Sequence, residues 1–391
     1  MLNQDYTAKL LDLEDVNITK VENFESGVHI WVELPRREHI CPCCGAHTDR
    51  VCDYREQIVK DVPFGRTSYL HFRKRRYRCM ECGKRFAEKN SFVPRYYRAT
   101  SRLIAAVIQT FRNVLSAKEI ASRYNISSST ALRYFDYVPC SRMQLPEVLS
   151  IDEFKGNAGG YKYQSILTDP EHKVILDILP NRFEGDLTSH FRTFENRNEV
   201  KYFLSDMNPH FRAVAAACFP KAKRIADRYH VTRMCMWAME NVRKKEQAKL
   251  SKKFRIYFKK SRQLLMKDSK TLTDEEMDRL ALMLEIAPRL ADAYRIKNDF
   301  LKVMHPSSSQ EAKPALIDWL TEITQLDLPE FEACSRAYHN WFHEILNSFD
   351  CPWTNGYTEG CNNKTKVIKR ICYGVKNFTR FRKRILFCSG H

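Results

Sequence analysis

Two aspartates, far apart in the sequence, are placed where they could perform phosphodiester chemistry together. Asp152 follows the mostly apolar stretch VLSI and Asp206 follows YFLS, so each is predicted to end a buried strand. Neighbouring strands would bring both carboxylates to one edge of a sheet, where they repel each other unless a cation lies between them. Hard oxygen ligands favour Mg²⁺ or Mn²⁺. The pair therefore predicts a divalent metal site.

Glu359 is the candidate for a third ligand. It lies near the start of the stretch NGYTEGCNNKTKVIKR and is the last acidic residue of the chain. Three carboxylates can hold two metal ions that activate a water or a 3′-hydroxyl and stabilise the leaving oxygen of a phosphodiester. The competing interpretation is three unrelated surface acids. Four amide or basic residues after Glu359 are predicted to contact DNA: Asn362, Lys366, Lys369 and Arg370.

Two Cys-x-x-Cys-Gly motifs, CPCCG at 41–45 and CMECG at 79–83, predict a metal site of another kind. Each motif turns two thiolates toward one point, and two motifs supply a closed tetrahedral site for structural Zn²⁺. The x-x spacing favours Cys41 over Cys43, and a β-hairpin is expected between the motifs. The alternative is a set of incidental buried cysteines. The predicted ligands are Cys41, Cys44, Cys79 and Cys82.

The composition narrows the class of protein. The 391 residues carry a net charge of +18, which favours a polyanionic partner, with nucleic acid first among them. The other ten of the 14 cysteines show no disulfide framework, the opening MLNQDYTAKLLDLEDV lacks a secretory pattern, and no apolar run reaches the length of a membrane helix. We expect a reduced, cytoplasmic protein with no membrane partner.

Two kinds of element precede the aspartates. Residues 1–95 are predicted to be a β-rich zinc-ribbon module, because GVHIWVELPR and RTSYLHFRKRRYRC alternate apolar and polar residues. Residues 96–146 are predicted to hold a helix-turn-helix, with helices at 117–124 and from Ser128. An ordinary helical hairpin is the alternative. The predicted DNA contacts of the second helix are Ser128, Ser129, Thr130 and Arg133.

The rest of the chain is predicted to be an α/β domain interrupted by helices. Residues 147–232 show three strands, a helix, a strand ending at Asp206, a helix and a fifth strand. Residues 233–347 are predicted to be entirely helical, including one helix over SRAYHNWFHEILNSF whose aromatics we assign to the core. The lysine-rich run 244–260 fits a solvated helix face or a DNA groove. Residues 348–391 complete the α/β domain with the glutamate helix.

The segments SIDEFKG, FLSDMNPHFRAVAAACFPKAKRIADRYHV and GYTEGCNNKTKVIKRICYGVKNFTRFRKRIL resemble the ISL-three family of bacterial insertion-sequence transposases, which are of the DDE type. The resemblance implies an RNase H-like catalytic domain. It also implies Mg²⁺-dependent strand cleavage and transfer at terminal inverted repeats, with Asp152, Asp206 and Glu359 as catalytic residues. The expected partners are double-stranded DNA, both element ends and target, and further copies of the chain in a homo-oligomer on that DNA.

Two further residues match a D-x-x-H signature of this family, Asp227 and His230. The resemblance implies that they support the metal ligands or contact DNA, and a core histidine is the alternative for His230. We interpret Asp169 and Asp177 as structural, and we do not assign Glu153 to the site. The competing functions are a catalytically inactive zinc-ribbon and helix-turn-helix regulator and a structure-selective nuclease. The presence of all three acids and of Lys366 favours an active transposase.

Overall fold

In the computed structural model of the chain, residues 13, 15–140, 144–256, 258 and 261–390 are described. The chain forms two compact units, one of Met1–Cys140 with Ile371–Tyr373 and Gly390–His391, the other of Ser141–Arg370 and Gly374–Ser389. Residues 1–12 and 14, which make up most of the opening stretch in which no secretory pattern is expected, lie outside the described residues. Within the described part, no helix has the length and apolar character needed to cross a membrane.

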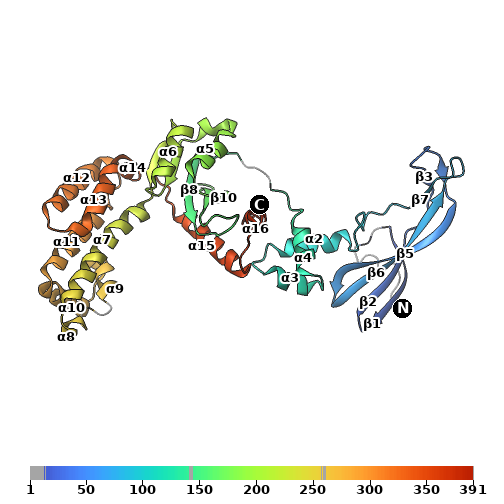
Figure 1. The fold of residues 1–391 in the computed structure, drawn as a ribbon, viewed down its shortest axis with the longest axis horizontal. Helices are drawn as coiled ribbons and strands as arrows, with labels where there is room; N and C mark the ends of the chain where they lie inside the picture. Colours follow the sequence, from blue (N-terminus) through green and yellow to red (C-terminus); the bar gives the residue numbers. More distant parts are fainter. Residues whose placement is uncertain (1–12, 14, 141–143, 257, 259–260, 391) are drawn as a thin grey trace. The chain divides into compact units, whose positions relative to one another are not determined.

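A twisted sheet dominates the first unit, drawn in blue in Figure 1. Its strand order is β1-β2-β6-β5, with β7 paired to β6. Ile30, Val32, Leu70 and Phe72 alternate with polar neighbours and form a core on one face. The long antiparallel pair β5–β6 is the hairpin predicted between the cysteine motifs. The strands are β1 (Asn17–Phe24), β2 (Gly27–Glu33), β5 (Val51–Phe64), β6 (Arg66–Arg78) and β7 (Arg85–Ala87). A separate short pair is β3 (His39–Ile40) with β4 (His47–Thr48).

Three short helices follow in the same unit: α2 (Ser101–Thr110), α3 (Ala117–Arg123) and α4 (Ser128–Phe135). Each is preceded by a capping hydroxyl residue whose side chain accepts a hydrogen bond from a backbone NH of the first turn. The helices at 117–124 and from Ser128 lie where the sequence predicts them. The buried Asp61 of β5 accepts hydrogen bonds from Thr100 Oγ1 at 2.6 Å and Arg102 Nε at 2.7 Å, which fixes α2 to the hairpin.

The second unit contains a five-stranded sheet with the order β10-β9-β8-β11-β12. Strands β8, β9 and β10 are antiparallel neighbours, whereas β11 runs parallel to both β8 and β12. All five strands lie in the segments predicted from the sequence. They are β8 (Val148–Phe154), β9 (Gln164–Asp169), β10 (Val174–Leu179), β11 (Tyr202–Ser205) and β12 (Lys223–Ala226).

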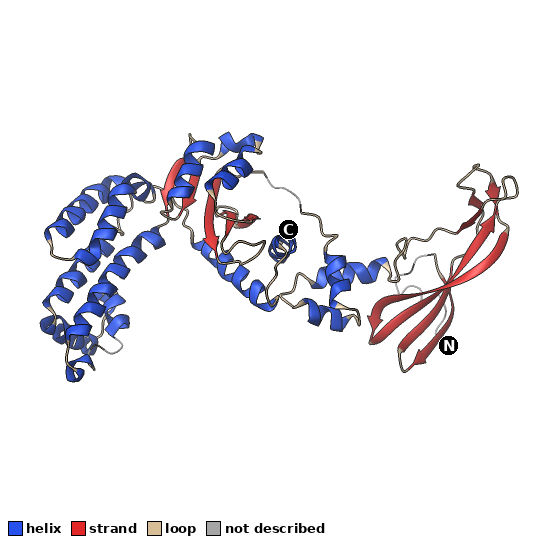
Figure 2. Ribbon diagram, in the orientation of Figure 1, coloured by secondary structure: helices blue, strands red, loops and turns tan. Residues whose placement is uncertain are grey.

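Helices cover both faces of this sheet, as Figure 2 shows. The helices α5 (Glu184–Arg192) and α6 (Pro209–Cys218) pack with Leu149, Ile151 and Phe203 into one core. The opposite face, which carries Ser150 and Thr168, contacts α15 (Gly356–Ile371), and α16 (Phe378–Cys388) packs beside β10. The sheet is therefore the central layer of three.

Every element between β12 and α15 in the described part of the chain is a helix, as predicted. The single helix predicted over SRAYHNWFHEILNSF is wrong, because Trp341, with φ −106° and ψ 19°, separates α13 (Glu332–Asn340) from α14 (Phe342–Asn347). Tyr338, Trp341 and Ile345 are buried in the core assigned to them. The other helices are α7 (Arg228–Lys249), α8 (Lys252–Arg255), α9 (Ser261–Met266), α10 (Asp274–Ile286), α11 (Pro288–Val303) and α12 (Ser309–Gln325). Short 3-10 helices lie at Glu195–Glu199, Ser269–Thr271 and Pro329–Phe331.

The lysine-rich run 244–260 begins on α7. Lys245 pairs with Glu330 at 2.9 Å and Lys249 with Glu246 at 2.8 Å. These pairs favour the interpretation of the run as a solvated, ion-paired helix face. Residues 257, 259 and 260 of the run lie outside the described residues.

Candidate functional site

The register of the second sheet aligns three aspartates across adjacent strands. Leu204 of β11 pairs with Ser150 of β8, and Ser205 pairs with Ala226 of β12. Asp206 and Asp152 lie two residues beyond the first pair and are therefore level, and Asp206 and Asp227 are level because they lie one residue beyond the second pair. Asp206 follows the end of β11, as predicted. Asp152 instead lies within β8, because β9 continues to pair as far as Phe154.

The two aspartates occupy an environment that disfavours their charged forms. Asp152 is 6% exposed, and its burial raises its pKa to about 6. Its Oδ1 accepts the Glu153 NH and its Oδ2 accepts Nδ2 of Asn362, both at 2.7 Å. Burial, followed by the negative charge of Asp152, raises the pKa of Asp206. The Oδ1 atom of Asp206 is buried and has no hydrogen-bond partner among the described residues.

The helix that carries Glu359 is docked on the sheet by buried hydroxyl groups. Thr358, fully buried, contacts Thr168 Oγ1 at 2.7 Å and Ser150 Oγ at 3.1 Å. The Ser150 hydroxyl also donates to Asn355 Oδ1 at 2.5 Å. These contacts fix the face of α15 on which Asn362 reaches Asp152. The register of the helix is therefore set one residue before Glu359 and again three residues after it.

Glu359 itself is exposed, and its carboxylate has no hydrogen-bond or ion-pair partner in the described part of the chain. The three carboxylates are not gathered at metal-ligand distance. Among the described residues, the groups whose ligand atoms all lie within 4.8 Å of one another are the four motif cysteines and Asp169, Glu171 and His172. Asp169 accepts hydrogen bonds from the backbone NH groups of Glu171 and His172. The cluster of Asp169, Glu171 and His172 therefore stabilises the β9–β10 turn.

The donor set around Asp152 and Asp206 fits a divalent cation. The donors are carboxylate oxygens, the ligands that Mg²⁺ and Mn²⁺ prefer. A bound cation would give the unpartnered buried oxygen of Asp206 a partner. It would also offset the electrostatic repulsion between the two acids. Asn362 Oδ1 is a second buried oxygen without a partner among the described residues.

Asp227 and His230 adjoin the two aspartates. Asp227 begins α7 by accepting the Tyr229 NH at 3.2 Å, and its other oxygen lies 2.5 Å from His230 Nδ1. Burial works to lower the pKa of His230, but the Asp227 carboxylate outweighs it, so the pKa is raised. The electrostatic effect of His230 opposes the upward pKa shifts of Asp152 and Asp206. Asp227 acts in the other direction, because its negative charge contributes to the raised pKa of both acids.

The four predicted zinc ligands lie together in the first unit. Cys41 Sγ is 3.6 Å from Cys82 Sγ, and Cys44 Sγ is 3.5 Å from Cys79 Sγ. A tetrahedral site with Zn–S bonds of about 2.3 Å requires sulfurs roughly 3.8 Å apart, so the cluster fits Zn²⁺. The backbone NH of Cys44, and less strongly that of Cys43, helps to lower the pKa of the Cys41 thiol to about 6. Cys43 is exposed and lies outside the cluster.

Comparison with known proteins identifies the family. A family model of the ISL3 DDE type, described as a transposase, matches residues 149–385, more than half of the chain. The chain belongs to the ISL3 family of transposases. A second model, described as the zinc-finger of transposase IS204/IS1001/IS1096/IS1165, matches residues 37–98. The family resemblance drawn from the sequence is confirmed.

Individual relatives agree with this assignment. The transposase for insertion sequence element IS1001 of Bordetella parapertussis is 24% identical over 359 residues, which cover 89% of this chain and 88% of that protein. The transposase for IS1557 of Mycobacterium tuberculosis H37Rv is 26% identical over 119 residues, 30% of this chain and 27% of that protein. A Lactococcus lactis protein named ATP-dependent protease is 27% identical over 117 residues, 30% of this chain and 36% of that protein.

The residues predicted to contact DNA occupy different environments in this transposase. Lys366 and Arg370 are exposed on α15, whereas Lys369 Nζ donates to the Lys155 carbonyl at 3.0 Å. Asn362 is only 4% exposed and bonds to Asp152, which corrects the DNA contact predicted for it. On α4, Ser129 and Arg133 are exposed, and Ser128 and Thr130 are half-buried.

Little in the sequence marks the residues that dock the glutamate helix on the sheet. Ser150 and Thr168 lie within apolar strands, and Thr358 directly precedes the candidate acid. Hydroxyl residues on a strand that is buried on both faces are the one signal that could have marked this contact, because buried hydroxyls require partners.

Proposed function

We propose that this transposase binds the terminal inverted repeats of an insertion sequence and catalyses metal-dependent cleavage and transfer of DNA strands. The observation that carries the proposal is the alignment of Asp152 with Asp206, with the Glu359 helix joined to Asp152 through Asn362. The sheet order β10-β9-β8-β11-β12, with helices inserted before α15, supports an RNase H-like catalytic domain.

In this proposal each acid has a defined role at the metal site. When bound, two Mg²⁺ or Mn²⁺ ions would activate the attacking hydroxyl or water and stabilise the leaving oxygen. Asp152 and Asp206 would hold the ions at the edge of the sheet, and Glu359 would contribute the third carboxylate from α15. Asn362 orients Asp152, while Asp227 orients His230 beside the acids. The exposed Lys366 and Arg370 face the phosphates of the DNA.

The two N-terminal modules recognise the DNA in this proposal. The zinc ribbon, 1–95, and the helix-turn-helix, 96–146, bind the element ends, with Zn²⁺ maintaining the fold of the ribbon. The catalytic domain consists of 147–232 and 348–391, and 233–347 is its helical insertion. We further propose that the protein acts in the cytoplasm as a homo-oligomer on its DNA, because both element ends and the target must be held together.

Incubation of the purified protein with Mg²⁺ and a DNA that carries the element's ends tests the function. The wild type is expected to nick at the ends, and Asp152→Asn, Asp206→Asn and Glu359→Gln should each reduce nicking by several powers of ten while binding the ends. A wild type that binds the ends but never nicks them would support the inactive regulator instead. Retained nicking by Glu359→Gln would exclude Glu359 as a ligand.

A further inference from the structure

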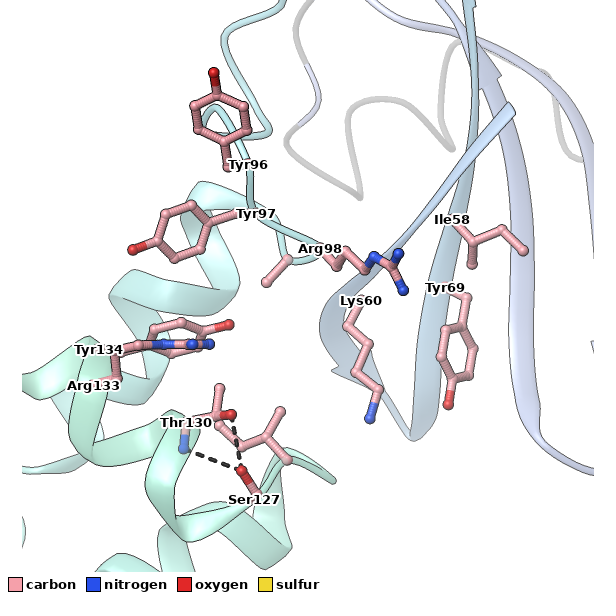
Figure 3. A pocket seen from close by; sticks show the side chains of 12 residues that line it. Ile58, Lys60, Tyr69, Tyr96, Tyr97, Arg98, Ser127, Thr130, Arg133 and Tyr134 are labelled. Atoms are coloured by element: carbon pink, nitrogen blue, oxygen red, sulfur yellow. Dashed lines mark hydrogen bonds between the residues drawn. The ribbon is translucent and has the colours of Figure 1, made fainter. Parts of the chain in front are cut away.

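A groove of about 760 Å³ lies within the first unit, between the β5–β6 hairpin and the start of α4. Figure 3 shows α4 and the loop before α2 on one side and the strands on the other. Its size falls in the range of sites that hold small molecules. Four tyrosines line it: Tyr69, Tyr96, Tyr97 and Tyr134. Tyr134 is buried, Tyr69 and Tyr97 are half-buried, and Tyr96 is exposed.

The groove is also positively charged. Lys60, Arg98 and Arg133 line it, and of the lining residues that the structure describes, none is acidic. The Lys60 ammonium lies 5.9 Å from the centre of the Tyr69 ring, and the Arg133 guanidinium lies 5.9 Å from that of Tyr134. The groove therefore combines cations with aromatic rings, which is the composition of sites that bind single-stranded nucleic acid.

Tyr96 at the edge of the groove is held in an unfavourable conformation. Its side chain is 87% exposed, and its φ of +68° lies in the left-handed region that residues other than glycine rarely adopt. Burial does not explain a large ring at this position. Arg95 lies over the ring, 4.7 Å from its centre. An exposed, strained aromatic residue beside a basic groove indicates a ligand-binding role.

We propose that this groove binds an unpaired nucleotide of a DNA strand, with the base stacked on Tyr96 and the phosphates paired with Lys60, Arg98 and Arg133. Bases that are paired in a duplex expose only their edges, in the DNA's own major and minor grooves. A duplex could therefore contact the basic side chains, but it could not stack a base on a tyrosine ring. The inference rests on the proposed function, because the strand is part of the DNA that the transposase holds. It adds a site for locally opened DNA to the duplex contacts of α4.

The test measures binding of the full-length protein to two fluorescent strands by anisotropy at fixed salt. One probe is a short oligothymidylate, and the other has the same length and phosphates but no bases. The wild type is expected to bind oligothymidylate about 5-fold to 100-fold more tightly than the abasic strand, the range for stacking of one base. Tyr96→Ala should remove this preference, and Tyr96→Phe should keep it.

A matched control is Tyr54→Ala. Tyr54 is 49% exposed on β5 and is covered by the Arg73 guanidinium at 4.1 Å, but it lies outside the groove. This variant should keep the preference for oligothymidylate. Circular dichroism melting checks that each variant is folded. If Tyr96→Ala is not folded, Arg98→Ala is measured in its place. Arg98→Ala should weaken binding of both probes about equally.

Two results would overturn the proposal. Equal affinity of the wild type for both strands would show that the groove binds phosphate alone. An unchanged preference in Tyr96→Ala would show that the base stacks elsewhere. Neither result bears on cleavage, because failure of the proposed function appears separately as the absence of end-specific nicking in a duplex assay with the wild type.

Discussion

At the residue scale, the decisive feature is that each acid is held by a different kind of contact. Asp152 is fixed by two hydrogen bonds, Asp206 has an unpartnered buried oxygen, and Glu359 projects from the helix surface. A bound cation would have as ligands three carboxylates that are not within metal-ligand distance of one another. This arrangement explains why the hydrogen bond from Asn362 is important, since it is the direct link between α15 and the acid pair.

Asn362→Ala should therefore lower nicking about 10-fold to 100-fold, the usual cost of removing a group that orients a metal ligand. Without the amide, Asp152 Oδ2 loses its hydrogen-bond donor, and only the bond from the Glu153 NH to Oδ1 still orients the carboxylate. Titration with Mn²⁺ should show weaker metal affinity, and binding of the element ends should be unchanged. The exposed neighbour provides the control, because Asn363→Ala should nick like the wild type. Equal nicking by both variants would contradict the role of Asn362.

At the element scale, α15 is positioned by a cluster of buried hydroxyls. Thr358→Val should lower the free energy of unfolding by about 1–3 kcal/mol, because Thr168 Oγ1 then loses its hydrogen-bond partner on α15 in the core. Urea denaturation monitored by circular dichroism measures this loss. Thr354→Val, before the helix, should change the midpoint less, because the exposed Thr354 hydroxyl makes only a long 3.4 Å contact with the Gly356 NH. A variant at Thr358 as stable as the wild type would show that apolar packing alone holds α15.

The zinc ribbon makes an independent prediction for the first unit. Cys82→Ser should lose the stoichiometric Zn²⁺ measured by elemental analysis, and the ribbon should become sensitive to proteolysis because metal binding and folding are coupled. Cys43→Ser is the matched control, since Cys43 lies in the same motif but outside the sulfur cluster. Full Zn²⁺ content in Cys82→Ser would mean that another residue completes the site.

Local patterns predicted the elements, and long-range contacts decided the details that the patterns missed. The alternation in GVHIWVELPR and the apolar runs before Asp152 and Asp206 suffice to locate strands, because period-two patterns are local. The position of Asp152 inside β8 depends on how far β9 pairs with it, and the burial of Asn362 depends on where α15 docks. The break at Trp341 likewise interrupts a continuous apolar stripe that gives no local stop signal.

At the scale of the whole molecule, the chain forms two compact units, and the proposed function assigns end binding to the first and cleavage to the second. The first contains the cysteine cluster, the α3–α4 helices and the tyrosine-lined groove, and the second contains the acid pair and the glutamate helix. The net charge of +18 fits the proposed function, because basic side chains favour contacts with the phosphates of DNA. Binding and cleavage should therefore respond to different substitutions.

Arg133→Ala in the full-length protein should weaken binding of the element ends, because an exposed guanidinium on α4 is removed. If the contact is to a phosphate, the slope of log affinity against log salt should fall by about 1. Asp206→Asn should show the opposite behaviour, with end binding at least as tight as in the wild type and no nicking, since it removes a negative charge from the metal site. Arg123→Ala is a suitable control, because Arg123 on α3 already pairs with Glu119 at 3.0 Å. Loss of end binding in Asp206→Asn with full binding in Arg133→Ala would reverse the assignment of the two units.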